Sequence, residues 1–357
     1  MNSRYSGSVP HPTNFFLPQY QSALGTVVHA TPLVELLKRS LPQARVVVAS
    51  SGLAEQVWQE NPHLERLLHT PNPLHDPVGA VRALRAARMF VGERYVTLLT
   101  TGNERTKITL AAALAGRSRR IGFAVHGALV QQHLAFDSAQ SQIENNLRLL
   151  AAAGVPRDPA WPTEPRLYPG SADRAFAETL LQDVRRPRIA LATQTSPTQR
   201  KSWSQERWVE LAQRLRSLYG AELVFIGAPA ETEAIDVLRA KISCSTTSAA
   251  GRTSIPQLAA VLKQCDLGIM LDTGPLHVAR GVNLPAVIIA PAWSPVHEWL
   301  PVGHPRYRIL KNADFPAPAP DDYIIDEVSV GDVLAATSDL LATARPAASE
   351  EGRTPES

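Results

Sequence analysis

Short apolar runs alternate with helix-like segments through most of this 357-residue chain, and this alternation restricts it to an α/β fold. The apolar runs predict strands at 14–17 (interrupted by Pro18), 45–49, 95–99, 119–123, 188–192, 223–226, 267–270 and 286–289. Helices are expected at 27–40 with Pro32 in the first turns, 53–60, 107–114, 205–219, 230–241 and 255–264. Strands that alternate with helices in this way predict parallel, doubly wound sheets.

The length of the chain predicts two domains, because 357 residues exceed the size of one ordinary hydrophobic core. Proline and arginine accumulate between the two strand-rich halves, as is typical of a connector. We therefore expect a first domain over 1–165, a linker over 166–187 and a second domain over 188–343. The last residues, 344–357, contain almost no apolar side chain and are expected to be disordered.

One polar turn after a predicted strand has the pattern of a phosphate site. Asp272-Thr273-Gly274-Pro275-Leu276-His277 follows the apolar run at 267–270 and leads into residues that suit a short helix. A strand, a glycine-containing turn and a helix start present free backbone N–H groups to a phosphate. Asp272 and His277 flank that turn. Aspartate also caps helices well, so a purely structural role for Asp272 stays open.

Other features exclude several classes of protein. No Gly-x-Gly-x-x-Gly follows a strand and no Walker-type lysine loop occurs, which argues against a dehydrogenase or a P-loop NTPase. The net charge of +3 is too small to indicate a nucleic-acid partner. Cys244 and Cys265 form no disulfide framework and no metal-ligand pattern, which suits a reducing compartment.

The N-terminus lacks the apolar core of a signal peptide, and no stretch approaches a transmembrane span. We expect a cytoplasmic protein, and peripheral contact with the inner face of the cytoplasmic membrane stays open.

Several motifs then occur in a fixed order. They are Lys201-Ser202-Trp203, Gly227-Ala228-Pro229-Ala230-Glu231, Gly251-Arg252-Thr253-Ser254-Ile255, the Asp272 turn and Pro291-Ala292-Trp293-Ser294-Pro295. This ordered set resembles glycosyltransferase family 9, the ADP-heptose:lipopolysaccharide heptosyltransferases. The resemblance covers roughly residues 14–310 and is strongest from 188 onward.

The resemblance implies the GT-B architecture, in which two Rossmann-like, doubly wound domains face each other across a cleft. It implies an inverting transfer of heptose from ADP-heptose to a lipopolysaccharide core or a related glycan. The C-terminal half would bind the nucleotide-sugar donor and the N-terminal half the acceptor. No catalytic metal and no cofactor besides the ADP-sugar donor are expected.

The resemblance also assigns donor-side residues. Lys201 would contact phosphate, Glu231 would hydrogen-bond the ribose, and Asp272 to Leu276 would form the diphosphate turn beside His277. Either Thr193 or Thr195 would contact the nucleotide. The chemistry agrees, because a lysine, backbone N–H groups and a helix N-terminus stabilise charge on a leaving diphosphate. The helix dipole accounts almost equally well for an acid at the position of Glu231.

One family position differs at the expected catalytic base. Relatives carry Gly-Asp in the first turn, whereas this chain has Gly25-Thr26. Threonine does not hold a proton near neutral pH and is therefore no general base. His29 and Glu104 are the possible substitutes. If no acceptor binds there, Thr26 is only a turn residue.

Three functions remain open on the sequence. The first is a working heptosyltransferase with a relocated base. The second is a catalytically degenerate relative that binds a nucleotide sugar or glycan without efficient turnover. The third is a UDP-sugar epimerase of the same architecture, which the Lys201 and Asp272 motifs fit less well. On the acceptor side, Arg120 and its neighbours Arg117 and Arg119 form either a solvated basic face or a contact for phosphates of an anionic lipid acceptor.

Overall fold

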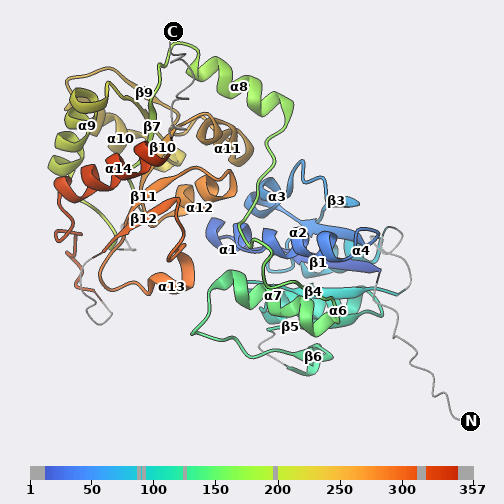
Figure 1. Ribbon diagram of the computed structural model, residues 1–357. Helices are drawn as coiled ribbons and strands as arrows, with labels where there is room; N and C mark the ends of the chain where they lie inside the picture. The colour runs from blue at the N-terminus through green and yellow to red at the C-terminus, as the bar shows by residue number, and fades with distance from the viewer. Residues whose placement is uncertain are drawn as a thin grey trace, which may run out of the picture. The chain divides into compact units, whose positions relative to one another are not determined.

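The computed structural model describes residues 13–86, 90, 94–123, 127–195, 200–311 and 319–344. The chain forms two compact units, and Figure 1 colours the chain continuously from blue at the N-terminus to red at the C-terminus. The first consists of Met1–Asp173, Ser254–Ala259 and His297–Trp299, and the second of Arg174–Thr253, Ala260–Val296 and Leu300–Ser357. The tail beyond residue 344, for which disorder is expected, lies outside the described residues.

The first unit contains a six-stranded parallel sheet in the order β3-β2-β1-β4-β5-β6. Its strands are β1 (Asn14–Gln19), β2 (Arg45–Ser50), β3 (Arg66–His69), β4 (Val96–Leu99), β5 (Arg119–Gly122) and β6 (Gln132–His133). Strands β1, β2 and β4 are almost wholly buried. Continuous apolar strands of this kind are typical of a parallel sheet that is covered by helices on both faces.

The helices of the first unit connect these strands. They are α1 (Leu24–Val28), α2 (Thr31–Ser40), α3 (Gly52–Trp58), α4 (Pro77–Ala86), α6 (Thr106–Ala115), α7 (Gln142–Ala153) and the 3-10 turn η1 (Gly127–Leu129). Phe16, Val47 and Ala111 belong to a core cluster that joins the sheet to α4 and α6. Helix α2 packs beside α7.

The second unit repeats the same topology. Its parallel sheet has the order β12-β11-β10-β7-β8-β9. If β7 is counted as the first strand of this unit, the order from β9 to β12 is 3-2-1-4-5-6, the Rossmann order that the first unit also has. The strands are β7 (Arg188–Ala192), β8 (Glu222–Phe225), β9 (Thr246–Ser248), β10 (Leu267–Leu271), β11 (Ala286–Ile289) and β12 (Tyr307–Leu310). The predicted α/β class with two Rossmann-like sheets is confirmed.

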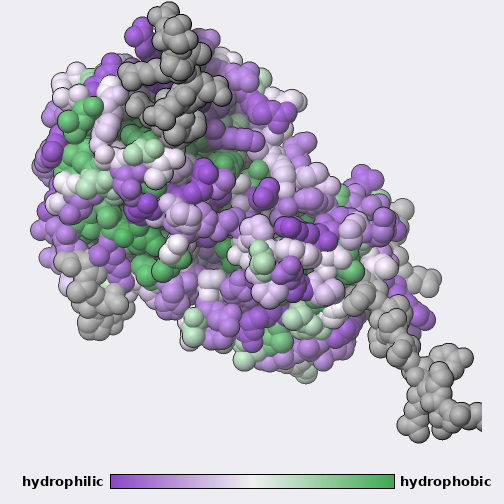
Figure 2. All heavy atoms as spheres, viewed as in Figure 1, coloured by the Kyte–Doolittle hydropathy of each residue, from purple (hydrophilic) through white to green (hydrophobic). Residues whose placement is uncertain are grey.

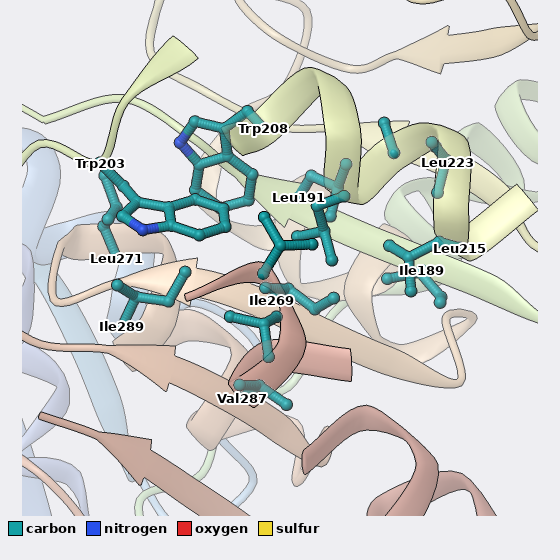
Figure 3. Close-up of a cluster of buried hydrophobic side chains, with 14 of the residues drawn as sticks. Ile189, Leu191, Trp203, Trp208, Leu215, Leu223, Ile269, Leu271, Val287 and Ile289 are labelled. Atoms are coloured by element: carbon teal, nitrogen blue, oxygen red, sulfur yellow. The ribbon is translucent and has the colours of Figure 1, made fainter. Parts of the chain in front are cut away.

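The other elements of the C-terminal half are α8 (Ser171–Leu181), α9 (Gln205–Tyr219), η3 (Pro229–Glu231), α10 (Thr232–Ala240), α11 (Ile255–Lys263), α12 (Gly274–Gly281), α13 (Val296–Trp299) and α14 (Val330–Ala344). Figure 3 shows the core, where side chains of β7, β10 and β11 meet two tryptophans. The rings of Trp203 and Trp208 pack edge to face, with centroids 4.9 Å apart.

Strand β1 does not stop at Pro18, contrary to the sequence prediction. Pro18 stands opposite Ala49 of β2 within the ladder, whereas the pairing with β4 covers only Phe15 and Phe16. Proline removes one backbone donor, which is tolerated where one side of a strand is unpaired. The strand therefore continues to Gln19.

The predicted helix over 27–40 is wrong in its extent, because the chain forms two helices there. Helix α1 ends at Val28, and α2 begins at Thr31 with Pro32 in its first turn. Proline fits that position, since the first turn of a helix needs no N–H donor from it. The break places Thr26 on a separate short helix directly after β1.

The expected linker over 166–187 contains regular structure, because α8 occupies Ser171–Leu181. The boundary between the two units in the sequence lies inside this helix.

None of the helices in the described part of the chain is long and apolar enough to cross a membrane. On the face shown in Figure 2, hydrophilic residues cover most of the surface and hydrophobic residues form smaller groups.

Candidate active site

In the second unit, Lys201 and Asp272 form a buried ion pair at the point where the strand order reverses. Asp272 follows β10, and Lys201 lies beyond the end of β7, which is the neighbouring strand. Lys201 Nζ lies 2.7 Å from Asp272 Oδ2, and the two side chains are 16% and 3% exposed. Ligands of doubly wound sheets bind at this reversal, outside the carboxyl ends of the strands. The pair thus occupies the expected ligand position.

The backbone around Lys201 is held on both sides. The carbonyl of Arg200 accepts a hydrogen bond from Trp293 Nε1 at 3.0 Å, and the indole of Trp203 donates to the carbonyl of Val328 at 2.9 Å. Trp203 is buried in the core of the unit. Its position explains why a tryptophan follows the lysine so closely: the aromatic anchor fixes the segment that carries the ammonium group.

Helix α12 begins directly beyond this pair. Its N-cap is Thr273, and within the described structure no side-chain hydrogen bond caps the helix. The interpretation of Asp272 as a capping residue is therefore wrong, because its carboxylate binds Lys201 instead. Gly274 and Pro275 form the first turn, and Leu276 is buried beneath it. An uncapped helix N-terminus attracts an anionic group.

His277 lies in the second turn of α12 and is only 5% exposed. Burial, followed by the nearby positive charge of Arg280, lowers the pKa of His277 to about 3, although Asp272 opposes the shift. The imidazole is therefore neutral at physiological pH. Arg280, three residues further on the same helix, is itself buried. A neutral His277 can donate or accept a hydrogen bond but supplies no positive charge.

The remaining donor-side candidates lie on the same edge of the sheet. Thr193 is buried directly after β7 and accepts a hydrogen bond from Gln194 Nε2 at 3.2 Å, while Thr195 is half-buried. Glu231 lies beyond β8, and its Oε2 accepts a hydrogen bond from the Ala228 backbone N–H at 2.7 Å. The carboxylate of Glu231 therefore stabilises its own turn.

In the first unit, a buried polar network fills the corresponding reversal between β1 and β4. Gln19 Nε2 donates to Thr100 Oγ1 at 2.9 Å, and Gln21 Nε2 donates to Gln19 Oε1 at 3.0 Å. Asn103 Nδ2 also donates to Thr100 Oγ1, at 3.0 Å, and Asn103 Oδ1 accepts from the Tyr20 N–H. These bonds join the turn after β1 to the turn after β4. They make a rigid polar floor at the carboxyl edge of the sheet.

Thr26 and Glu104 belong to these two joined turns. Gly102 has a φ of +81°, and a Cβ there would lie 2.7 Å from Thr26 Cγ2 and 2.8 Å from Gln21 Cγ. Thr26 is half-buried and the neighbouring Gly25 is buried. Glu104 follows two residues after Gly102, and its buried Oε2 has no hydrogen-bond partner in the described structure. The structure thus brings a carboxylate into the turn that contacts Thr26.

His29 and Arg120 occupy different surroundings. His29 is 1% exposed, and its ring stacks on Trp299, with ring centroids 5.6 Å apart. Arg120 lies in the first half of β5, so it is not at the carboxyl edge of the strand. Its guanidinium donates to the backbone carbonyls of Leu129 and Ser118. Both residues are engaged in packing or backbone contacts, and the structure does not bring Arg120 together with Thr26.

Several residues at these two sites were not singled out from the sequence. They are Gln19, Gln21, Thr100 and Asn103 in the first unit, and Arg280 in the second. Polar residues that directly follow buried strands would have indicated the first group. Arg280 could have been found from its spacing of three residues from His277, which places both on one side of a helix.

The comparisons with known proteins agree with this geometry. The model of the family described as glycosyltransferase family 9 (heptosyltransferase) matches residues 91–306, which is more than half of the chain. Lipopolysaccharide heptosyltransferase 3 of Escherichia coli K12 is 22% identical over 363 aligned residues, which cover 91% of this chain and 97% of that protein.

Two solved structures share the fold. The family 9 glycosyltransferase of Veillonella parvula superimposes with a TM-score of 0.80 at 18% identity, covering 93% of this chain and 98% of that one. The ADP-heptose lipopolysaccharide heptosyltransferase II of E. coli gives a TM-score of 0.75 at 18% identity, covering 92% and 99%. The match of the family model over most of the chain, together with this shared fold, shows that the chain belongs to glycosyltransferase family 9, the heptosyltransferases.

Proposed function

We propose that this protein is an inverting heptosyltransferase that transfers heptose from ADP-heptose to a sugar of the lipopolysaccharide core or a related glycan. The observation that carries the proposal is the buried Lys201–Asp272 pair at the strand reversal of the second sheet, next to the N-terminus of α12. Family membership and the names of the similar proteins, which are lipopolysaccharide heptosyltransferases, support the choice of donor and acceptor.

On the donor side, the second unit would stabilise the leaving ADP. Breaking the bond between the sugar and the diphosphate places negative charge on the phosphate oxygens. Lys201 supplies a positive charge, and the uncapped N–H groups of α12 supply partial positive charge at the same edge of the sheet. Asp272 orients the lysine. Neutral His277 would act as a hydrogen-bonding group beside the phosphates and not as an acid, because its pKa is about 3.

These groups would stabilise the leaving charge without a bound metal or further cofactor. We therefore propose that turnover persists after treatment with EDTA. Loss of ADP release on chelation, with recovery on addition of Mg²⁺, would contradict this part of the proposal.

On the acceptor side, we propose that Glu104 is the general base. A carboxylate can take the proton of the attacking hydroxyl, which Thr26 cannot. The turn of Glu104 contacts Thr26 through Gly102, and Glu104 Oε2 has no hydrogen-bond partner in the described structure, so one carboxylate oxygen is not already committed to another group. His29 suits this role less well, because its ring is enclosed by the stacking on Trp299. Gly25 would let the acceptor approach the backbone beside Thr26.

The direct test is a measurement of ADP release from ADP-heptose in the presence of a lipopolysaccharide-core acceptor. The wild-type protein should release ADP only when the acceptor is present. Glu104→Gln keeps the size of the side chain and removes its basicity, so kcat should fall about 10²–10⁴-fold while ADP-heptose affinity is unchanged. Glu65→Gln, an exposed acid of the same unit, is the matched control. Wild-type turnover by Glu104→Gln would exclude Glu104 as the base.

A second function is favoured by Thr26 itself, which occupies the position of the family's usual base. A degenerate relative would bind the nucleotide sugar or glycan without turning it over. Calorimetric titration with ADP-heptose distinguishes the two functions. Binding without acceptor-dependent ADP release would support the binding protein, whereas binding with release supports the transferase.

We further propose that the protein works in the cytoplasm with peripheral contact to the inner face of the cytoplasmic membrane and without a nucleic-acid partner. The lipid anchor of a lipopolysaccharide-core acceptor supports this location, because the enzyme must reach a sugar that is fixed to the membrane. The small net charge of +3 gives no support for nucleic-acid binding.

A further inference from the structure

Helices α4 and α6 of the first unit pack side by side and form an apolar groove of about 470 Å³ on their outer side. Val78, Leu110 and Leu114 line the groove and are 69%, 42% and 49% exposed. Only eight large hydrophobic side chains in the described structure are this exposed, and these three lie together. Soluble surfaces seldom gather such residues without a partner.

The rim of the groove is basic. Arg82, Arg85 and Lys107 line it, and none of the lining residues that the structure describes is acidic. All three side chains are exposed, and none forms an ion pair with a carboxylate in the described structure. Arg85 Nε and Lys107 Nζ donate to the backbone carbonyls of Leu114 and Leu74.

We propose that this α4–α6 groove is a docking surface for an anionic phospholipid bilayer. Leucine and valine side chains would enter the headgroup boundary, and the three cations would contact lipid phosphates, which is the usual chemistry of an interfacial helix. A bilayer offers an apolar layer for the leucines and valine and phosphate groups for the cations over one continuous surface. A nucleic acid would satisfy the cations but would leave the exposed leucines in water.

The proposal rests on the proposed function, since it gives the transferase a way to reach a membrane-anchored acceptor. The groove also belongs to the unit that contains Thr26 and Glu104 and thus the proposed acceptor side. Docking through this unit would keep the acceptor-binding turns at the membrane surface without a spanning helix.

The test is co-sedimentation of the full-length protein with vesicles of phosphatidylglycerol and phosphatidylethanolamine, compared with vesicles of phosphatidylcholine alone. The wild type should sediment with the anionic vesicles, and added salt should release it. Arg82→Glu should weaken this binding about fivefold or more for the lost cation, and Leu110→Ser with Leu114→Ser should weaken it further.

Matched controls exist in the second unit. Leu218→Ser with Val237→Ser changes two side chains of similar exposure, 60% and 50%, and Arg214→Glu changes an exposed arginine. These variants should bind vesicles like the wild type. Equal vesicle binding by the groove variants and the controls, or no binding by the wild type at low salt, would overturn the proposal.

A second measurement separates this proposal from the transferase proposal. ADP release with a delipidated core acceptor should be unchanged in the groove variants, whereas release with a vesicle-embedded acceptor should fall in parallel with vesicle binding. Vesicle binding itself needs no turnover, so a protein without activity still reports on the groove. A fall in ADP release with the delipidated acceptor would assign the groove to the acceptor site instead.

Discussion

Lys201 Nζ and Asp272 Oδ2 lie 2.7 Å apart although the two residues are 71 positions apart in the sequence. The contact joins the segments that follow β7 and β10, the two strands at the reversal of the second sheet. Asp272 is almost completely buried and depends on the lysine for neutralisation. The same lysine is the proposed phosphate ligand, so folding and donor binding depend on one side chain.

Lys201→Ala should therefore impair both stability and activity. Removal of the ammonium group leaves a buried carboxylate without its partner, and the free energy of unfolding should fall by about 3 kcal/mol. Urea unfolding and calorimetric titration with ADP-heptose measure the two effects. In Lys201→Met with Asp272→Asn, most of the stability should return while ADP-heptose affinity stays low. Lys241→Ala is the control, and a stable Lys201→Ala protein with normal affinity would refute this role.

Thr26→Asp tests where the base lies. In the Glu104→Gln background, a new carboxylate beside the same turn should restore ADP release by at least tenfold. In the wild-type background it should change kcat little, because the proposed base Glu104 is still present. Steady-state ADP release measures both. A large gain in the wild-type background would show instead that the base has been lost, and Thr26→Asn controls for size.

His277 should make stability depend on pH. Its pKa is about 3 in the folded protein and near 6.5 when unfolded, so the unfolded state binds the extra proton between these values. The contribution of neutral His277 to the free energy of unfolding is complete above pH 6.5 and is lost as the pH falls toward 3. At pH 5 the loss is roughly 2 kcal/mol. His277→Gln should flatten this part of the curve of unfolding free energy against pH. An unchanged slope in the variant would contradict the burial of a neutral imidazole.

Gly102→Ala should destabilise the first unit by about 2 kcal/mol. The left-handed φ of +81° strains an alanine, and the new Cβ would meet Thr26 Cγ2 at 2.7 Å. Gly220→Ala, at a φ of +62° with open space around it, carries only the backbone strain and serves as control. Thr26→Ser should reduce the penalty of Gly102→Ala in thermal or urea unfolding. Equal penalties for both glycines would show that the contact with Thr26 is unimportant.

The local pattern predicts the buried centre of both sheets well. Strands β7 and β11 and helix α9 have the expected bounds, because their apolar period is uninterrupted. The local pattern does not predict the edge strands β3, β6, β9 and β12. Each of them is short and pairs with a neighbouring strand on one side only, and local sequence does not indicate that neighbour. Pro18 misleads for a related reason: its effect depends on which neighbour β1 pairs with.

The donor turn could be predicted because strand, turn and helix are contiguous from Leu267 to Gly281. The polar network of the first unit could not, because the bond from Gln19 to Thr100 spans 81 positions. The ion pair of Lys201 with Asp272 is equally remote, and only the resemblance placed both residues at one site. Glu104 and His29 are the two candidate bases from the sequence. The burial of His29 and the stacking of its ring on Trp299 are the reason to prefer Glu104.

The shared strand order of the two units has a consequence for divergence in this family. In each unit the proposed site residues lie on the connections after the first and fourth strands: Thr26 and Glu104 in one, Lys201 and Asp272 in the other. These four residues lie on connections between strands and are not members of the hydrophobic core clusters that hold the sheets together. If the first unit binds the acceptor and the second the donor, as proposed, the two specificities can change independently: exchanging the two connections of the first unit with those of a relative should change the acceptor and leave the nucleotide preference intact.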